Sequence, residues 1–510
     1  MIRDLFSPGN QIKLGALLSY ATLGVTNVVG ILLTPFIVRS FGQAEFGLYV
    51  LMGSLISYMT VLDFGLNNTI VRYVAKYRAE HDMQGEEKFL ATVMAIYFGI
   101  SLLVLFCGYL VYLNLDSVFG RSLTIEEFSE ARIMFVVLIL NIAFTLPGNA
   151  FGAICNGYER FVFPRTITLA RYVVRSMMVV ALLLFGGKAV SLVILDTLMN
   201  LSGIVINAFY VVTKIKTRIH FRKVEISFVK KILGYSVWIF VFAIVSQFQW
   251  QTGQVVLGIL SGTKLVAIYG IGVVLGTYYG AFSTAISGLF LPRATQMVTG
   301  QANSEELTSM WIKVGRMSLL VLFYVLGAFI LYGRDFIVLW VGEGYNESWL
   351  VALLIMIGYT TPLTQNFANS ILEARAMLSF KAVLYLSMTA IGALFGALLV
   401  TKHGVTGMVV GSIAAWLVSQ LIMNVYYHKV LKLNVQRFFR ELLDRIFISF
   451  VVVLVVCWSI YFHDEVTWSY FILNVMIYST IYAAAIFSYG MKSDERHLIF
   501  GRLGRFAYQG

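Results

Sequence analysis

The chain has 510 residues, of which 59% are hydrophobic and only 13% charged, and its mean hydropathy is +0.81. Soluble domains use roughly 25% charged residues, so the composition excludes a soluble enzyme and indicates a protein that lies mostly inside a membrane. The net charge of +12 is spread over short stretches between apolar segments, which argues against a nucleic-acid partner. The sequence has no phosphate-binding loop and no His or Cys cluster with metal-ligand spacing, so we expect no metal and no cofactor.

About fourteen apolar stretches reach the length of roughly 20 residues that a membrane-spanning helix needs. They predict an all-α polytopic membrane protein, because a helix satisfies its own backbone hydrogen bonds in lipid. In chain order the expected spans are residues 14–38, 47–71, 90–113, 132–155, 166–186, 189–212, 233–261, 265–291, 314–333, 349–374, 382–401, 406–427, 445–463 and 469–490.

The loops between these spans differ in charge. Most of the 38 Lys and Arg residues fall in the loops that share a side with the N-terminus. Cytoplasmic loops carry the excess of positive charge in membrane proteins. We therefore expect both termini to lie in the cytoplasm.

Several landmarks recur at nearly constant separations, which indicates an internal duplication. The pairs are Gly42 and Gly262, Tyr49 and Tyr269, Arg72 and Arg293, Pro147 and Pro362, Arg160 and Arg375, and Lys214 and Lys429. An even number of spans in each copy makes the two repeats parallel. We expect a six-helix lobe at 1–213, a basic cytoplasmic linker at 214–232, a second six-helix lobe at 233–428, and two additional spans at 445–490.

Two segments mix basic and apolar residues. Residues 429–444 are expected to form a short amphipathic helix on the anionic cytoplasmic leaflet, with Arg437 and Arg440 beside Phe438 and Phe439. A solvated connector is the alternative. Residues 491–510 form a cytoplasmic tail of similar composition.

Arg171 and Arg175 are four residues apart in the fifth span, so both lie on one helical face. A charge at membrane depth costs about 2.5–3.5 kcal/mol even on insertion scales. Two guanidinium groups facing a water-filled lumen suit a phosphate or diphosphate. The alternative is that both side chains reach back to the cytoplasmic surface, which the position of Arg171 allows more easily.

The acidic residues at membrane depth have two possible roles. Asp63 with Asn67 in the second span, and Asp196 in the sixth, are candidates for ion coupling or for neutralising one of the arginines. Glu373 in the tenth span is a candidate of the same kind, or a partner of Arg375.

Two further spans carry polar faces. Such a face suits the wall of a sugar-binding cavity, although hydrogen bonds between helices use the same amides. The residues are Gln247, Trp250, Gln251 and Gln254 in the seventh span and Thr361, Gln365 and Asn369 in the tenth.

The chain resembles a known family over residues 14–428. The resemblance rests on LLTPFIVRSFGQAEFGLYVLMGSLISYMTVLDFGLNNTIVRYVAKYR, from Leu32 to Arg78, and on FIVLWVGEGY, from Phe336 to Tyr345. Both are similar to the polysaccharide exporters, or oligosaccharide flippases, of the MATE-like multidrug/oligosaccharidyl-lipid/polysaccharide superfamily. The resemblance implies a V-shaped pair of lobes and alternating-access export of an undecaprenyl-diphosphate-linked oligosaccharide across the bacterial inner membrane.

The resemblance and the charged segments together suggest partners, and two other functions are alternatives. We expect a lipid-linked oligosaccharide substrate, contact with anionic lipids, glycan polymerases and other polysaccharide-assembly proteins as neighbours, and coupling to a Na⁺ or H⁺ gradient or to the membrane potential. The alternatives are a cation-coupled multidrug exporter of the same fold, or a membrane glycan polymerase or ligase. Polymerases usually have a long exported loop, whereas the outer loop expected near residues 114–130 is short.

Overall fold

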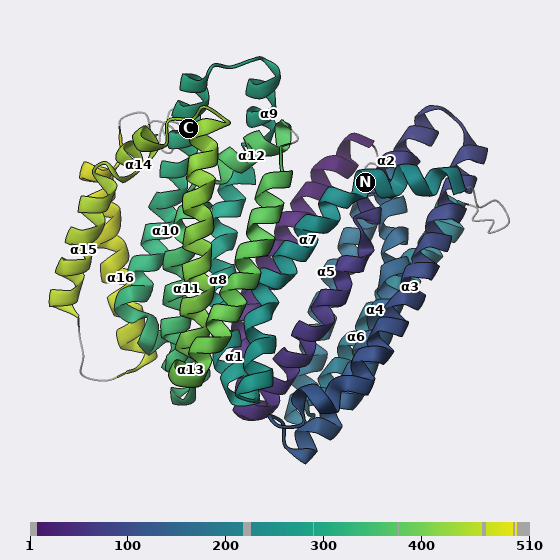
Figure 1. Cartoon of the computed structure of the whole chain (residues 1–510), viewed down its shortest axis with the longest axis horizontal. Coiled ribbons are helices and arrows are strands. Elements are labelled where there is room, and N and C mark those ends of the chain that lie inside the picture. Colours follow the sequence, from purple (N-terminus) through teal and green to yellow (C-terminus); the bar gives the residue numbers. More distant parts are fainter. Residues whose placement is uncertain are drawn as a thin grey trace, which may run out of the picture. The chain divides into compact units, whose positions relative to one another are not determined.

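The computed structural model describes residues 8–217, 226–288, 290–375, 377–461, 466–492 and 495–496. All regular secondary structure in these ranges is helical (Figure 1). The chain divides into two compact units, Met1–Ala267 and Ile268–Gly510. Parts of the linker 214–232 and of the tail 491–510 lie outside the described residues, so the expectations for these segments stay predictions.

The first unit contains long helices joined by short turns. Its elements are α1 (Pro8–Ser57), η2 (Tyr58–Asp63), α2 (Leu66–Ala79), α3 (Met83–Phe119), α4 (Ile125–Gly157), α5 (Val162–Leu184), α6 (Ala189–Tyr210), η3 (Val211–Ile215) and α7 (Ile226–Leu260). In this unit α4 packs against α2, α3 and α6, while α5 packs between α1 and α6. The seventh expected span, α7, packs against α1 and α3 of this unit.

Two helix starts in the first unit are capped by side chains. The side chain of Asp82 accepts a hydrogen bond from Gly85 N at the start of α3, and Thr124 with Glu127 forms a capping box at the start of α4. Because α3 runs to Phe119 and α4 begins at Ile125, most of the outer loop expected at 114–130 is helical.

The second expected span is not one continuous helix. After the 3₁₀ segment Tyr58–Asp63, Phe64 and Gly65 both have left-handed backbone angles, with φ of 52° and 68°. This conformation ends a helix, because the α-helical hydrogen-bond ladder cannot continue through it. Hydropathy alone does not predict this break in the helix, since the residues on both sides are apolar.

Glycines with positive φ mark equivalent places in the duplication. Gly42 (φ 73°) precedes the second span and Gly262 (φ 84°) precedes the eighth. Gly186 (φ 77°) separates the fifth and sixth spans, and Gly404 (φ 52°) separates the eleventh and twelfth. Side chains with a Cβ rarely adopt these angles, so the two halves of the chain use the same residue type for the same turns.

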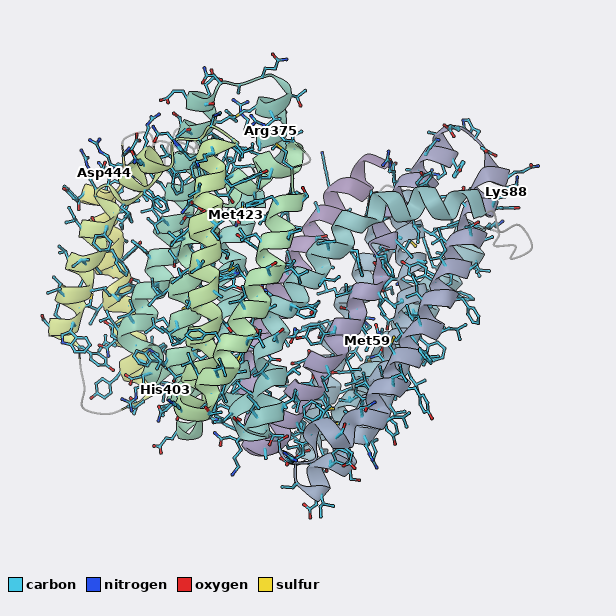
Figure 2. The ribbon with its side chains drawn as sticks, viewed as in Figure 1. Met59, Lys88, Arg375, His403, Met423 and Asp444 are labelled. Atoms are coloured by element: carbon cyan, nitrogen blue, oxygen red, sulfur yellow. The ribbon has the colours of Figure 1, made fainter. Side chains whose placement is uncertain are left out.

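The second unit continues from α8. Its elements are α8 (Thr263–Gly288), α9 (Leu291–Thr299), α10 (Ser304–Val341), η5 (Glu343–Tyr345), α11 (Glu347–Thr364), α12 (Asn366–Ala374), α13 (Ser379–Lys429), α14 (Val435–Leu443), α15 (Ile446–Ile460), α16 (Trp468–Ala485) and η6 (Ile486–Gly490). Figure 2 shows His403, beside the bend of α13, at the opposite end of this unit from Arg375 and Asp444. The tenth expected span bends by 47° between α11 and α12, where Pro362 removes a backbone donor from the last turn of α11.

The described helices account for all fourteen expected spans. Ten helices are long and apolar enough to cross a membrane, or eleven if α11 and α12 count as one span. Two of them are interrupted stretches, Lys13–Ala79 (α1, η2 and α2) and Ser379–Lys429 (α13), and each covers two expected spans, while α7 covers the seventh. Large apolar side chains such as Leu398 and Val455 are exposed on these helices, as expected where lipid replaces water.

The amphipathic segment forms helix α14, and part of its apolar side packs on protein. Phe438 is fully buried and stacks on Trp311 of α10 with ring centroids 3.8 Å apart, and Leu442 is also buried. Leu443 on the same helix is exposed. Contact between α14 and the cytoplasmic leaflet therefore stays a prediction, and it would have to use exposed residues of α14 such as Leu443.

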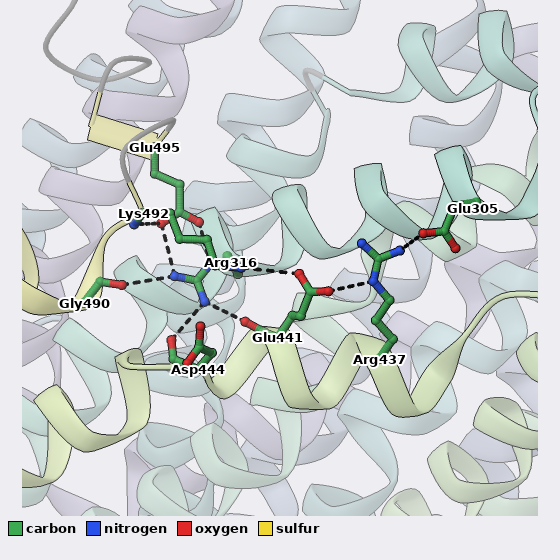
Figure 3. A network of polar contacts seen from close by, with 8 residues as sticks. All are labelled: Glu305, Arg316, Arg437, Glu441, Asp444, Gly490, Lys492 and Glu495. Atoms are coloured by element: carbon green, nitrogen blue, oxygen red, sulfur yellow. Dashed lines mark hydrogen bonds and ion pairs between the residues drawn. The ribbon is translucent and has the colours of Figure 1, made fainter.

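A buried arginine joins α10 to the C-terminal segments (Figure 3). Arg316, 1% exposed, donates to both carboxylate oxygens of Glu495 and to the backbone oxygens of Glu441, Asp444 and Gly490. These bonds use all five donors of the guanidinium group. Glu441 also contacts Arg437 and Lys492, so the network connects α10, α14 and the end of η6.

Candidate functional site

The two predicted arginines lie on α5, which forms an antiparallel hairpin with α6. Gly186, with its positive φ, permits the turn, and the side chain of Glu45 accepts a hydrogen bond of 2.6 Å from Ala189 N at the start of α6. Arg171 and Arg175, four residues apart on α5, therefore face two residues that are also four apart on α6. The hairpin carries two polar pairs, one helical turn apart.

The first pair is ionic. Arg175 Nε donates to Asp196 Oδ1 at 2.5 Å, and Arg175 Nη2 donates to Asp196 Oδ2 at 2.9 Å. Tyr49 of α1 donates to the same Oδ2 at 3.4 Å. The two charged side chains are 22% and 24% exposed, so the pair is open to its surroundings on one side.

The second pair joins a cation to an amide. Arg171 Nη1 donates to Asn200 Oδ1 at 2.9 Å, and Asn200 Nδ2 in turn donates to Asn141 Oδ1 and Thr145 Oγ1 of α4. Gly203 leaves room for this arrangement, because a Cβ there would lie 2.8 Å from Arg171 Nη1. The hydrogen bonds of Arg171 among the described residues all use Nη1.

These two pairs, Arg175–Asp196 and Arg171–Asn200, are called the hairpin ladder below. It contains two positive charges and one negative charge, since the partners of Arg171 are neutral. The alternative that both arginines reach the cytoplasmic surface does not describe this structure, because both guanidinium groups bond to α6. Of the two acids considered as partners, Asp196 contacts Arg175.

Asp63 lies elsewhere in the first unit. Its Oδ1 accepts a hydrogen bond of 3.0 Å from the buried Tyr97, and Asn67 is exposed at the start of α2. The structure therefore does not bring Asp63 or Asn67 together with the ladder in this unit. A coupling role for either residue stays a prediction.

Polar side chains of α7 make hydrogen bonds with the end of α1 and with η2. Gln254, 6% exposed, accepts one from Ser54, Thr252 shares one with Tyr58 at 2.8 Å, and Gln247 Nε2 lies 3.5 Å from Thr60 Oγ1. Trp250 and Gln251 are partly buried. This arrangement corresponds to the interhelical alternative for Gln254, while the sugar-binding role of the face stays a prediction.

The polar residues of the tenth span lie in the second unit around the joint of α11 and α12. Gln365, fully buried, donates to Asn424 at 2.9 Å and accepts a hydrogen bond from Gln420, both on α13. Thr361 is partly buried, and its backbone oxygen accepts a hydrogen bond of 2.7 Å from the Thr364 hydroxyl.

Asn369 is the centre of a second polar group in that unit. Its Oδ1 accepts hydrogen bonds from Lys381 Nζ at 2.9 Å and from Tyr427 at 3.0 Å. Glu373 is exposed and close enough to Lys381 to interact with it electrostatically. Sequence reasoning did not single out Lys381 or Tyr427.

Sequence reasoning also missed four residues at the ladder, which are Tyr49, Asn141, Thr145 and Asn200. A signal was present, because Asn141 and Thr145 are four apart in α4, and Asp196 and Asn200 are four apart in α6. No group of three or more His, Cys, Asp or Glu side chains that could hold a metal ion occurs among the described residues.

The fold and the ladder define a class: an all-α polytopic membrane protein with two arginines paired to polar side chains inside a helical hairpin. Comparison with known proteins gives the family. Residues 15–298 match the model of the polysaccharide biosynthesis protein family, and the chain belongs to that family. The chain is 24% identical over 371 residues to the "Putative O-antigen transporter" of Shigella flexneri, which covers 70% of this chain and 81% of the relative.

Two solved structures share the fold. The lipid II flippase MurJ in an inward closed conformation has a TM-score of 0.67 at 16% identity and covers 96% of this chain and 99% of its own. An inward-facing multidrug resistance MATE family transporter has a TM-score of 0.55 at 15% identity, covering 78% and 95%. The names of these proteins are those of transporters and a flippase and not of enzymes, in agreement with the expectation that this chain is no polymerase or ligase. The family match and the shared fold confirm the resemblance to the MATE-like superfamily.

Proposed function

We propose that this protein is a flippase. It moves a polyprenyl-diphosphate-linked oligosaccharide, with undecaprenyl as the expected carrier, from the cytoplasmic to the outer leaflet for cell-surface polysaccharide synthesis. The family supports this role, and the observation that carries the substrate class is the hairpin ladder, with its excess of one positive charge at membrane depth.

The chemistry of the ladder matches a diphosphate. A charged headgroup is costly in hydrocarbon, so a flippase must offer it fixed positive partners along a hydrated path. The planar guanidinium group binds two phosphate oxygens at once, which a lysine ammonium group does not. Arg171 and Arg175 are one turn apart, with about 5–6 Å expected between their Cβ atoms, so a single diphosphate can contact both.

The ladder disfavours the multidrug alternative. A cationic drug near Arg171 and Arg175 meets two positive charges against the single carboxylate of Asp196. Like charges at close range repel in a site of low dielectric constant. An anionic headgroup gains from the same arrangement.

A flippase of this kind acts in the bacterial inner membrane by alternating access, with both termini in the cytoplasm. The amide-rich faces around Gln251 and Asn369 then contact the sugars, and polysaccharide polymerases receive the product. An ion gradient or the membrane potential drives the cycle, with Asp63 and Glu373 as candidate coupling residues.

Reconstitution tests the function directly. Liposomes containing the purified protein should move a fluorescent polyprenyl-diphosphate oligosaccharide between leaflets, measured by protection from an external enzyme that cleaves the sugar. Protein-free liposomes and liposomes containing the Arg171→Ala/Arg175→Ala variant should retain the substrate on its original side. Transport of a cationic dye with no movement of the lipid-linked sugar would contradict the proposal.

A further inference from the structure

We infer that Asp196 occupies the place of a substrate phosphate on Arg175, and that binding of the diphosphate displaces it. This inference rests on the proposed function, because it assigns a competitor to the same site. It makes Asp196 the residue that sets the affinity of the site for the headgroup.

The geometry of the ion pair supports this assignment. Both Nε and Nη2 of Arg175 bond to the two oxygens of Asp196, so one edge of the guanidinium fork is fully occupied. This two-point arrangement is also the one in which a guanidinium group binds phosphate oxygens. A phosphate that uses this edge must therefore replace the carboxylate.

Arg171 and Arg175 differ in their partners, and this difference sets the order in which the two phosphates of the headgroup bind. Arg171 bonds through Nη1 to a neutral amide, and no other hydrogen bond of its guanidinium group occurs in the described part of the chain. The Nε and Nη2 atoms of Arg171 can therefore donate hydrogen bonds to one phosphate without first releasing a carboxylate. Once that phosphate is bound, the second phosphate of the same headgroup is held near Arg175, at a high effective concentration.

The displaced carboxylate has a second partner. Tyr49 already donates to Asp196 Oδ2 at 3.4 Å, and Asp196 is 24% exposed. A carboxylate that leaves Arg175 can keep and shorten this hydrogen bond and gain hydration, so the exchange does not strand a buried charge. The energetic difference between the two partners of Arg175 is then small, as an alternating cycle of binding and release requires.

The probe for this inference is inorganic pyrophosphate binding to the full-length purified protein in detergent, measured by isothermal titration calorimetry. Asp196→Asn keeps the shape and one acceptor oxygen but removes the competing charge. We expect it to bind pyrophosphate about tenfold more tightly than the unmodified protein, because one partly exposed charged hydrogen-bond pair no longer has to be broken. Tyr49→Phe should bind more weakly, since the displaced carboxylate loses its second partner.

Matched variants separate competition from a structural effect. Adding Arg175→Ala to Asp196→Asn should abolish the gain, and Glu130→Gln, which removes the carboxylate of the surface pair with Lys188, should change nothing. Orthophosphate, which has no second phosphate to reach Arg175, should gain less than pyrophosphate in Asp196→Asn. A purely structural ion pair predicts lower stability and unchanged or weaker binding in Asp196→Asn, and that result in monodisperse protein would overturn the inference.

The outcome is distinguishable from failure of the proposed function. If the liposome assay shows no transport but Asp196→Asn binds pyrophosphate more tightly, the competition stands and the flippase role does not. If transport occurs but Asp196→Asn and the unmodified protein bind pyrophosphate equally, Asp196 is only a structural partner of Arg175.

Discussion

The carboxylate of Asp196 accepts hydrogen bonds from both Nε and Nη2 of Arg175, although the two residues are 21 positions apart in the chain. The turn at Gly186 makes this contact possible, since it sets α5 and α6 antiparallel. One helical turn away the same register places Arg171 opposite Asn200. The hairpin therefore holds one guanidinium group paired with a carboxylate and one paired only with a neutral amide, on adjacent turns.

Replacing Arg171 should strongly reduce transport. Arg171→Ala removes the guanidinium group whose second edge is available, and we expect transport of the lipid-linked sugar in liposomes to fall by about ten- to a hundredfold, the equivalent of one or two charged hydrogen bonds. Arg171→Lys keeps the charge but loses the planar fork, so it should fall between Ala and the unmodified protein. Arg121→Ala, at an exposed site, serves as the control. Normal transport by well-folded Arg171→Ala would remove this residue from the site.

Asn200 should act through Arg171. In Asn200→Ala the Arg171 guanidinium loses its acceptor, and Asn141 and Thr145 lose the donor that joins them to α6. We expect the free energy of unfolding in detergent to fall by about 1–3 kcal/mol, with pyrophosphate affinity reduced as well. Asn114→Ala, where the amide contacts only its own helix, should leave both quantities within error. An unchanged pyrophosphate affinity would show that Arg171 needs no support from α6.

The membrane spans were predictable because hydropathy over about 20 residues is a local property of the sequence. The breaks inside them were not. Phe64 takes a left-handed backbone conformation before Gly65, in a run whose hydropathy predicts a continuous helix. The long helices α1 and α13 are each interrupted at a glycine that apolar periodicity does not distinguish from a packing glycine.

The candidate site was partly predictable. The spacing of Arg171 and Arg175 places them on one face of a helix, but the partner of each depends on the register of α5 against α6, which the sequence does not state. Arg316 was missed for a related reason. It lies at the edge of a span, where an arginine usually reaches the membrane surface, and its carboxylate partner Glu495 is 179 positions further along the chain.

Orientation can be tested by chemical labelling. In a background with Cys107, Cys155 and Cys457 replaced by Ala, single cysteines at Asn114 and Gly187 should react with an impermeant thiol reagent added outside intact cells, and one at Lys216 should not. The expected pattern follows from the concentration of Lys and Arg on the side of Lys216. Permeabilised cells, in which all three sites should react, provide the control. Labelling of Lys216→Cys alone in intact cells would reverse the orientation.

The last two helices should depend on Arg316 for their attachment. Arg316→Ala removes the guanidinium donor from the Glu495 carboxylate and from three backbone oxygens, and breaking a buried ion pair costs about 3–5 kcal/mol. The thermal unfolding midpoint of the purified protein should fall by several degrees. Arg316→Lys should recover little of this loss, because one ammonium group has three donors and cannot reach acceptors on three segments at once. Arg440→Ala on the exposed side of α14 should change the midpoint by less than the error of measurement. If Arg316→Ala unfolded at the same temperature as Arg440→Ala, apolar packing such as that of Phe438 on Trp311 would be enough to hold the C-terminal segments in place.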